Sequence, residues 1–157
     1  MERIGIYGGT FNPPHVGHMA AAQQAVDLLR LNKLLLIPDR IAPHKSLPEN
    51  SPTPEQRLQM LKIAAEGIPN VEISDLELRR KGPSYTYQTV EQLKKQYPQA
   101  ELLLLMGTDM FLAFDNWKNW QWLIQNVTLA VLYRGQKGEQ AAIQEKKNAL
   151  CGLGARV

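Results

Sequence analysis

The chain has little of what crosslinks a protein or anchors it in a membrane. Its one cysteine, Cys151, can form no internal disulfide and cannot by itself make a zinc site, which agrees with a reducing compartment. No apolar run approaches the ~18 residues that a transmembrane helix requires. The first residues read as a strand and lack the basic and long apolar regions of a signal peptide. We therefore expect a soluble, cytoplasmic protein without membrane association.

The charge is also modest. Charged residues make up 21% of the 157 residues, and the formal net charge is +3. Because the Lys and Arg residues are scattered, no nucleic-acid-binding face is indicated, although the charge suits small anionic ligands. A hydrophobic share of 44% at this length predicts one domain over residues 1–157.

Short apolar segments alternate with helical patterns along the chain. Strands are predicted at residues 3–7, 34–38, 71–74, 101–106 and 128–132. Apolar residues recur with helical spacing in 16–29, 58–65 and 89–97, and residues 139–148 also look helical. The alternation predicts an α/β fold with a Rossmann-like, doubly wound parallel sheet. Ligands of such sheets bind beyond the carboxyl ends of the strands, so the loops there are the candidate site.

The first of these loops carries the densest signal, the sequence GGTFNPPHVGH over residues 8–18. Its two leading glycines let backbone N–H groups approach an anion. If the next helix begins near Pro14, His15 and His18 lie on one face of its first turn, where the helix dipole favours phosphates. A tight turn with packed or capping histidines is the alternative. Zinc is disfavoured because no Cys pair or further His lies at a matching spacing.

This segment resembles the HxGH signature of nucleotidyltransferases, in the form found in bacterial nicotinate-nucleotide adenylyltransferases. The resemblance implies the nucleotidyltransferase fold and the transfer of AMP from ATP to nicotinate mononucleotide. The products would be nicotinate adenine dinucleotide and pyrophosphate, in NAD biosynthesis. It also implies that His15 and His18 contact the ATP phosphates and stabilise the transition state.

The segment after the second predicted strand, IPDRIAPHK over 37–45, is similar to the family's IPxxxPPHK, with Ala42 in place of a common proline. Lys45, together with His44, can bring positive charge to the triphosphate, and an exposed surface lysine is the alternative. Proline-rich residues 39–54 predict a mobile loop over the site. Arg57 in the following helix is either near the site or on the surface.

After the third predicted strand, DLELRRKGPSYT over 75–86 resembles the family's D-x-E-x-x-R-x-G-x-S-Y-T. Thr86 is expected to start the next helix, where free backbone N–H groups can hold a carboxylate such as that of nicotinate. An ordinary N-capped helix start is the alternative.

After the fourth predicted strand, GTD over 107–109 resembles the family's GxD element. Gly107 lets a nucleotide approach the strand end, and Asp109 offers acceptors to ribose hydroxyls. A buried aspartate that caps the next helix is the alternative.

Three tryptophans follow the GTD segment. Trp117 can stack on a pyridinium ring, whereas Trp120 and Trp122 are expected in packing or an interface. After the fifth predicted strand, YRG over 133–135 resembles the family's R-P-G turn, so Arg134 is a candidate phosphate clamp.

Together, the motifs and the resemblance imply two sets of binding residues. The ATP set is Gly8, Gly9, Thr10, Phe11, His15, His18, Lys45, Gly107 and Asp109. The mononucleotide set is Tyr85, Thr86, Asp109, Trp117, Lys118 and Arg134. Mg²⁺ is implied as the companion of ATP, with no metal held by the protein alone. A homodimer or larger assembly is a family-level expectation.

The family pattern continues with a further strand, an ISSTxIR segment that contacts ATP, and terminal helices, none of which occurs in this sequence. We therefore expect the C-terminal part of the fold to be missing and an edge of the sheet to be exposed. Transfer to the amidated mononucleotide or to phosphopantetheine, and a non-catalytic nucleotide-binding module, remain alternatives. Nicotinamide-dependent oxidoreduction is disfavoured because Gly-x-Gly-x-x-Gly is absent from the first turn.

Overall fold

The computed structural model describes residues 2–9, 16–39, 51–132 and 138–157. Strands and helices alternate in the order β1 (Arg3–Gly9), α1 (Val16–Leu28), β2 (Lys33–Pro38), α2 (Pro54–Ala64), β3 (Val71–Ile73) and α3 (Thr86–Gln96). They continue as β4 (Glu101–Gly107), α4 (Thr108–Leu112), the 3₁₀ helix η1 (Phe114–Asn116), α5 (Trp120–Asn126), β5 (Thr128–Leu132) and α6 (Glu139–Cys151).

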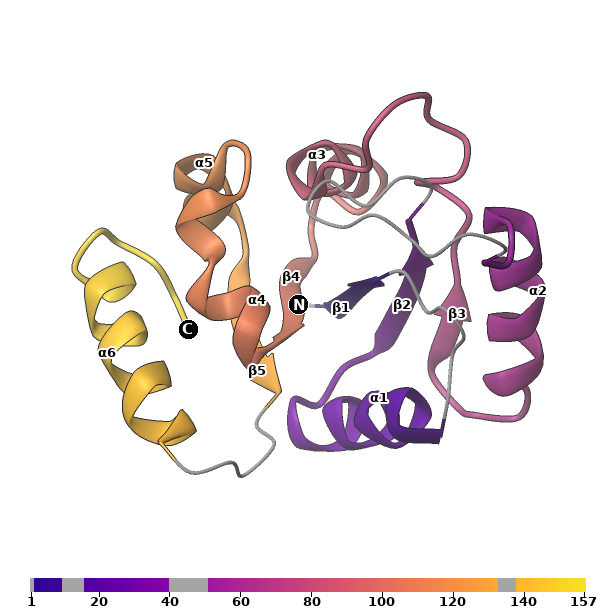
Figure 1. The fold of residues 1–157 in the computed structure, drawn as a ribbon, viewed down its shortest axis with the longest axis horizontal. Helices are drawn as coiled ribbons and strands as arrows, with labels where there is room; N and C mark the ends of the chain where they lie inside the picture. Colours follow the sequence, from indigo (N-terminus) through magenta and orange to yellow (C-terminus); the bar gives the residue numbers. More distant parts are fainter. Residues whose placement is uncertain (1, 10–15, 40–50, 133–137) are drawn as a thin grey trace.

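The five strands form one parallel sheet in the order β3-β2-β1-β4-β5. Figure 1 shows α1 on one side of this sheet and α3 on the other, as a doubly wound sheet requires. The predicted fold class is thus confirmed. None of the helices in the described part of the chain is both long and apolar enough to cross a membrane.

Each face of the sheet packs on its own hydrophobic core because side chains alternate between faces along a strand. On β4, Leu103 and Leu105 pack with residues of α1 and α2. Leu102 and Leu104 pack on the opposite face with residues of α3, α4, α5 and α6. The uninterrupted apolar run of β4 follows from this burial on both sides.

Helix α2 begins earlier than its apolar pattern indicated. Thr53 is the N-cap residue, its side chain accepts from the Gln56 backbone N–H, and the Gln56 side chain accepts from the Thr53 backbone N–H. This capping box places Pro54 in the first turn of the helix, where its missing N–H has no cost. The predicted loop over 39–54 therefore ends before Pro54, and its residues 40–50 lie outside the described part.

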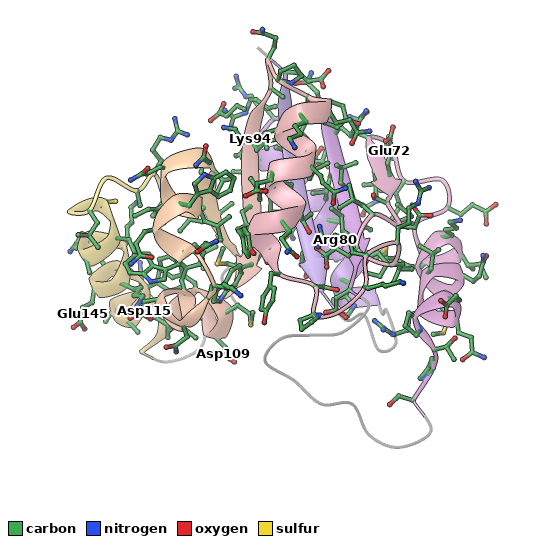
Figure 2. The ribbon with its side chains drawn as sticks, turned by 90° about the horizontal axis from the view of Figure 1, so that it is seen from above. Glu72, Arg80, Lys94, Asp109, Asp115 and Glu145 are labelled. Atoms are coloured by element: carbon green, nitrogen blue, oxygen red, sulfur yellow. The ribbon has the colours of Figure 1, made fainter. Side chains whose placement is uncertain are left out.

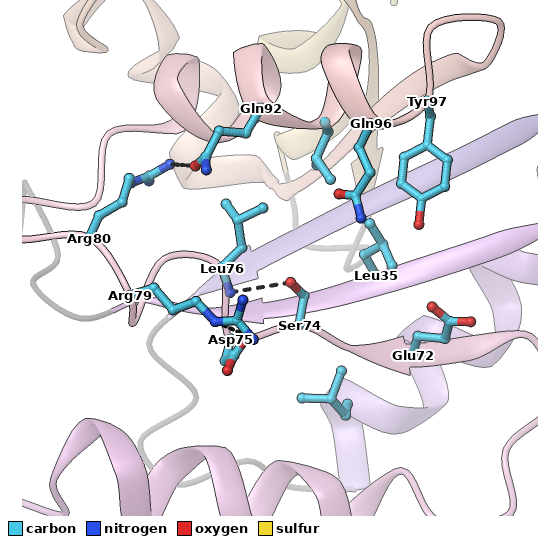
Figure 3. Close-up of a pocket in the computed structure, with 12 residues that line it drawn as sticks. Leu35, Glu72, Ser74, Asp75, Leu76, Arg79, Arg80, Gln92, Gln96 and Tyr97 are labelled. Atoms are coloured by element: carbon cyan, nitrogen blue, oxygen red, sulfur yellow. Dashed lines mark hydrogen bonds and ion pairs between the residues drawn. The ribbon is translucent and has the colours of Figure 1, made fainter.

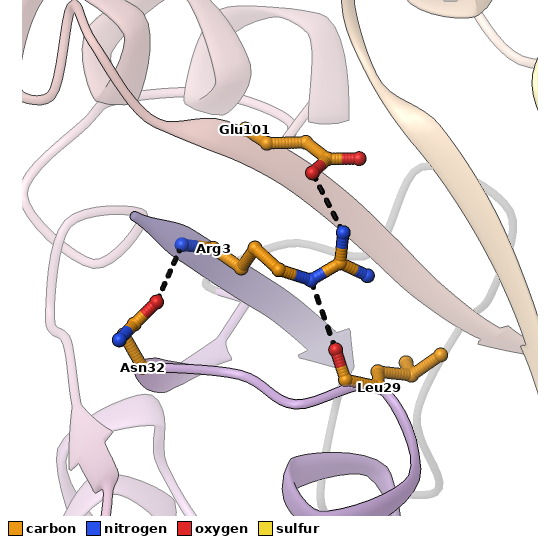
Figure 4. A network of polar contacts seen from close by, with 4 residues as sticks. All are labelled: Arg3, Leu29, Asn32 and Glu101. Carbon is orange, nitrogen blue, oxygen red and sulfur yellow. Dashed lines mark hydrogen bonds and ion pairs between the residues drawn. The ribbon is translucent and has the colours of Figure 1, made fainter. Parts of the chain in front are cut away.

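The amino-terminal ends of the strands are tied together by Arg3, as Figure 4 shows. Its guanidinium donates to the Leu29 carbonyl at 2.9 Å and pairs with Glu101 at 2.7 Å. Its backbone N–H donates to Asn32 Oδ1 at 2.8 Å. These contacts join β1, β4 and the connection between α1 and β2 at the end of the sheet opposite the candidate site.

The chain returns to the sheet after α6. Arg156 forms an isolated parallel bridge to Thr128, and its carbonyl accepts from the Leu129 N–H at 2.8 Å. As the sequence indicated, these last residues form no further strand, although the bridge covers the start of the β5 edge.

Candidate functional site

The carboxyl ends of β1 and β4 lie side by side. The two strands pair in parallel up to Tyr7 and Leu105, so Gly9 and Gly107 both come two residues beyond the same pair. A Cβ on Gly107 would meet no atom of the described residues within 4 Å, so none of these residues fills the space beside this strand end. The two glycine-terminated strands thus form the edge at which ligands of such a sheet bind.

His18 is the third residue of α1 as described, which starts at Val16. Its side chain is half-buried and lies in the first turn, as predicted from the HxGH spacing. A cationic or hydrogen-bonding side chain here adds to the N–H groups of the helix terminus as an anion-binding element. Five other predicted residues lie outside the described ranges: Thr10, Phe11, His15, Lys45 and Arg134.

Asp109 is exposed in the first turn of α4 and does not cap it. The N-cap position belongs to Gly107, so the alternative of a buried, capping aspartate is wrong. Figure 2 shows Asp109 on the lower side of the molecule, at the outer edge of α4. Thr108, which lies between Gly107 and Asp109, is held in place, because its hydroxyl donates a buried hydrogen bond of 2.8 Å to Glu139 Oε2. The carboxylate of Asp109 is thus presented on a fixed turn and is accessible to a ligand.

The amino-terminal end of α3 lies near the loop that follows η1. Helix α3 starts at Thr86, as predicted, with Tyr85 as its N-cap residue and no side-chain capping hydrogen bond. The alternative of an ordinary side-chain cap is therefore not what the structure contains. Lys118 Nζ lies 4.8 Å from the centre of the Tyr85 ring, in cation–π range. This contact brings two of the predicted mononucleotide segments together.

Trp117 packs partly into the core next to the same contact. Its ring lies 4.9 Å from that of Phe114, at an angle of 45°. Its indole N–H is buried and has no hydrogen-bond partner among the described residues. A buried donor without a partner is costly. Trp120 and Trp122 pack against the core, as expected for structural residues.

Arg57 is not a surface residue. Its side chain is fully buried, and its Nη1 lies 3.3 Å from Oδ1 of Asp39, the residue that follows β2. A buried guanidinium needs such a partner, because desolvation of an unpaired charge is expensive. The pair ties the start of α2 to the carboxyl end of β2, on the same edge of the sheet as the glycines of β1.

A second buried polar cluster, which sequence reasoning missed, lies between the segment after β3 and helix α3. The Thr89 hydroxyl donates to Glu77 Oε2 at 2.7 Å, and Arg80 Nη2 donates to the same hydroxyl at 2.7 Å. Burial raises the pKa of the Glu77 carboxyl to about 7, against the opposing effects of the Thr89 hydrogen bond and the Arg80 charge. Burial also lowers the pKa of Arg80. A threonine within the apolar stripe of a helix was the available signal, because a buried hydroxyl requires a partner.

A separate cavity of about 510 Å³ lies between β3, the segment after it and α3. Figure 3 shows its polar rim, which includes Arg80, Gln92 and Tyr97. None of the predicted nucleotide-binding residues is among those that line it. The strand-end glycines, His18 and Asp109 therefore form a different region from this cavity. No group of three or more His, Cys, Asp or Glu residues suited to a metal ion occurs in the ranges that the structure covers.

The parallel sheet defines a Rossmann-like α/β protein, with glycines at two strand ends and a histidine in the first turn of α1. Residues 6–149 match the family described as cytidylyltransferase-like, and the chain belongs to that family.

The chain is also similar to curated proteins that share one name. The chain is 42% identical over 134 residues to a probable nicotinate-nucleotide adenylyltransferase of Geobacillus thermodenitrificans, a match that covers 85% of this chain and 62% of the relative. It is 43% identical over 132 residues to a protein of the same name from Shewanella baltica, covering 84% of this chain and 60% of the relative. The chain thus spans less than two thirds of the length of these relatives.

Solved structures share the fold. A Plasmodium falciparum nicotinic acid mononucleotide adenylyltransferase complexed with NaAD has a TM-score of 0.78 at 21% identity, over 93% of this chain and 71% of that one. A putative nicotinate-nucleotide adenylyltransferase from Vibrio parahaemolyticus has a TM-score of 0.71 at 24% identity, over 95% of this chain and 80% of that one.

Proposed function

We propose that the protein transfers AMP from ATP to nicotinate mononucleotide, forming nicotinate adenine dinucleotide and releasing pyrophosphate. The observation that carries the proposal is the amino-terminal end of α3, which has no side-chain cap and lies beside Lys118. Free N–H groups at a helix start favour a carboxylate, and a lysine adds positive charge. The names of the curated relatives support nicotinate mononucleotide as the substrate that carries this carboxylate.

In this proposal Trp117, which is partly buried, contributes the apolar contact to the pyridine ring. Tyr85 and Thr86 offer backbone groups, and Asp109 accepts hydrogen bonds from ribose hydroxyls. Gly8, Gly9 and Gly107 leave room for ATP beside the strand ends. The roles of Thr10, Phe11, His15, Lys45 and Arg134 stay predictions from the sequence motifs.

The reaction needs no covalent enzyme intermediate. The 5′-phosphate of the mononucleotide attacks the α-phosphorus of ATP, and the bond to pyrophosphate breaks in line. The attacking phosphate is already anionic at neutral pH, so a general base is unnecessary. Catalysis then consists of positioning and of neutralising the charge on the transferred and leaving phosphates. In this mechanism His18, in the first turn of α1, supplies a donor to those phosphates.

Mg²⁺ enters this reaction as part of the ATP substrate complex. A cytoplasmic location, a single domain and a homodimer belong to the same proposal and rest on the sequence motifs and composition.

The test is turnover with ATP and Mg²⁺, with nicotinate mononucleotide and nicotinamide mononucleotide in parallel assays that follow both pyrophosphate and dinucleotide. We expect the acid to be used and the amide to be used much less. Changing His18 to alanine should lower kcat by ~10²–10³, the usual cost of one lost transition-state donor. Gln23→Ala, on the exposed side of the same helix, is the matched control. Wild-type turnover of neither substrate, or a His18→Ala rate within a few-fold of wild type, would contradict the proposal.

A further inference from the structure

The segment that connects β3 to α3 is held by side chains and contains no helix or strand. Residues 74–85 form only turns and bends, yet Glu77 in this segment is buried with 6% exposure. Glu77 is bound to α3 through the fully buried hydroxyl of Thr89. A hydroxyl has one proton to donate, and Thr89 gives it to Glu77 while accepting from Arg80. The direction of the Arg80 bond is determined, because a guanidinium can only donate.

Arg80 extends this contact along α3 in both directions. Its Nη2 also lies 3.4 Å from the carbonyl oxygen of Tyr85, the N-cap residue of the helix. Its Nη1 donates to Gln92 Oε1 at 2.9 Å, a contact that Figure 3 shows at the rim of the cavity. One guanidinium thus spans from the N-cap residue to Gln92 in the body of the helix.

The first turn of α3 depends on these contacts for its position. It has no side-chain capping bond of its own, and residues 74–85 lead into it without a ladder of backbone hydrogen bonds to the sheet. Binding sites lose function when their groups are displaced by more than ~0.5 Å, so a turn that presents N–H groups to a ligand needs support behind it.

We propose that Glu77, Thr89 and Arg80 are positioning residues, which hold the first turn of α3 and so determine the affinity for the carboxylate-bearing mononucleotide. The substrate part of this inference rests on the proposed function. None of the three residues needs to touch the mononucleotide. Their effect reaches the ligand through Tyr85 and Thr86, and through the Tyr85 ring that Lys118 contacts.

Thr89→Val tests the positioning unit formed by Glu77, Thr89 and Arg80, because it removes the Thr89 hydroxyl and nearly keeps the side-chain volume. We expect KM for nicotinate mononucleotide to rise roughly tenfold, the scale of one lost hydrogen bond, with KM for ATP changed less than about twofold. Thr89→Ser restores the hydroxyl and should return KM to near the wild-type value. Thr128→Val, the same change at the far end of the sheet on β5, is the matched control.

A structural role without positioning gives a different pattern. In that case Thr89→Val would lower the melting temperature and kcat and leave both KM values unchanged. This result would overturn the proposal. Equal rises in KM for both substrates would overturn it too. If Thr89→Val does not fold, Arg80→Lys gives the same test, since it keeps the charge and removes the planar fork that contacts Tyr85, Thr89 and Gln92.

Hydrogen exchange supplies a readout that needs no substrate. Backbone amides of residues 85–89 should exchange faster in Thr89→Val than in wild type, while amides of β4 should not change. If the wild-type protein turned over no mononucleotide, the proposed function would fail, and faster exchange would still support the positioning unit. Unchanged exchange at residues 85–89 would overturn the unit whatever the substrate is.

Discussion

Replacing Glu77 with glutamine should change how the stability of the protein depends on pH. Burial raises the pKa of the Glu77 carboxyl from its ordinary value of 4.5 to about 7. The folded protein therefore keeps this proton up to about pH 7, whereas the unfolded chain releases it near pH 4.5. The stability that Glu77 contributes is fully present below about pH 4.5 and is lost as the pH rises through about 7. Glutamine has no such proton and should lack this loss.

The magnitude follows from the two pKa values. Their separation of about 2.5, at about 1.4 kcal/mol per pKa unit, corresponds to about 3 kcal/mol. Besides burial, three groups affect the pKa of the carboxyl: the Thr89 hydroxyl on α3, the Arg80 guanidinium on the same segment as Glu77, and Asp39 after β2, whose negative charge further raises the pKa. The first two lower it but do not offset the desolvation of a side chain that is 6% exposed.

Urea unfolding of both proteins at a series of pH values measures the effect. The free energy of unfolding of Glu77→Gln, minus that of wild type, should increase by about 3 kcal/mol between about pH 4 and about pH 8. Glu91→Gln, which removes an exposed carboxylate from α3, is the matched control. A difference between Glu77→Gln and wild type that is constant across this range would refute the argument from burial.

Two further predictions concern stability. Gly5→Ala should destabilise the fold by about 1–3 kcal/mol in urea unfolding, because its Cβ would lie 2.6 Å from Leu31 Cδ1 and 2.8 Å from Leu34 Cδ1 in a packed core; unchanged stability would mean that both leucines rearrange freely. Thr53→Ala should cost about 1 kcal/mol, since it removes the side-chain acceptor of the Gln56 N–H, and Thr53→Ser should recover most of it. Equal losses in both Thr53 variants would exclude the cap as the cause.

Much of the candidate site could be predicted from the sequence because it sits directly after strands. The last residue of an apolar run marks the carboxyl end of a strand. The polar or glycine residues that follow are then assigned to the edge of the sheet where the carboxyl ends of the strands lie. Gly107 and Asp109 after β4 were located in this way, whereas His18 and Thr86 were located from the motifs at the starts of α1 and α3. Their contacts with substrates remain predictions.

The sequence by itself determined the five strands and the helices α1, α2, α3 and α6, because these elements are encoded in local periods of apolar residues and in turn residues a few positions apart. The short helix α5 was not among the predicted elements. Only the tertiary structure decided which polar groups share a partner. Arg57 and Asp39 are 18 residues apart, and Glu77 and Thr89 are 12 apart. Whether such a group is solvated on the surface or buried in a pair depends on how neighbouring elements pack, since burial is a property of the surroundings and not of the residue.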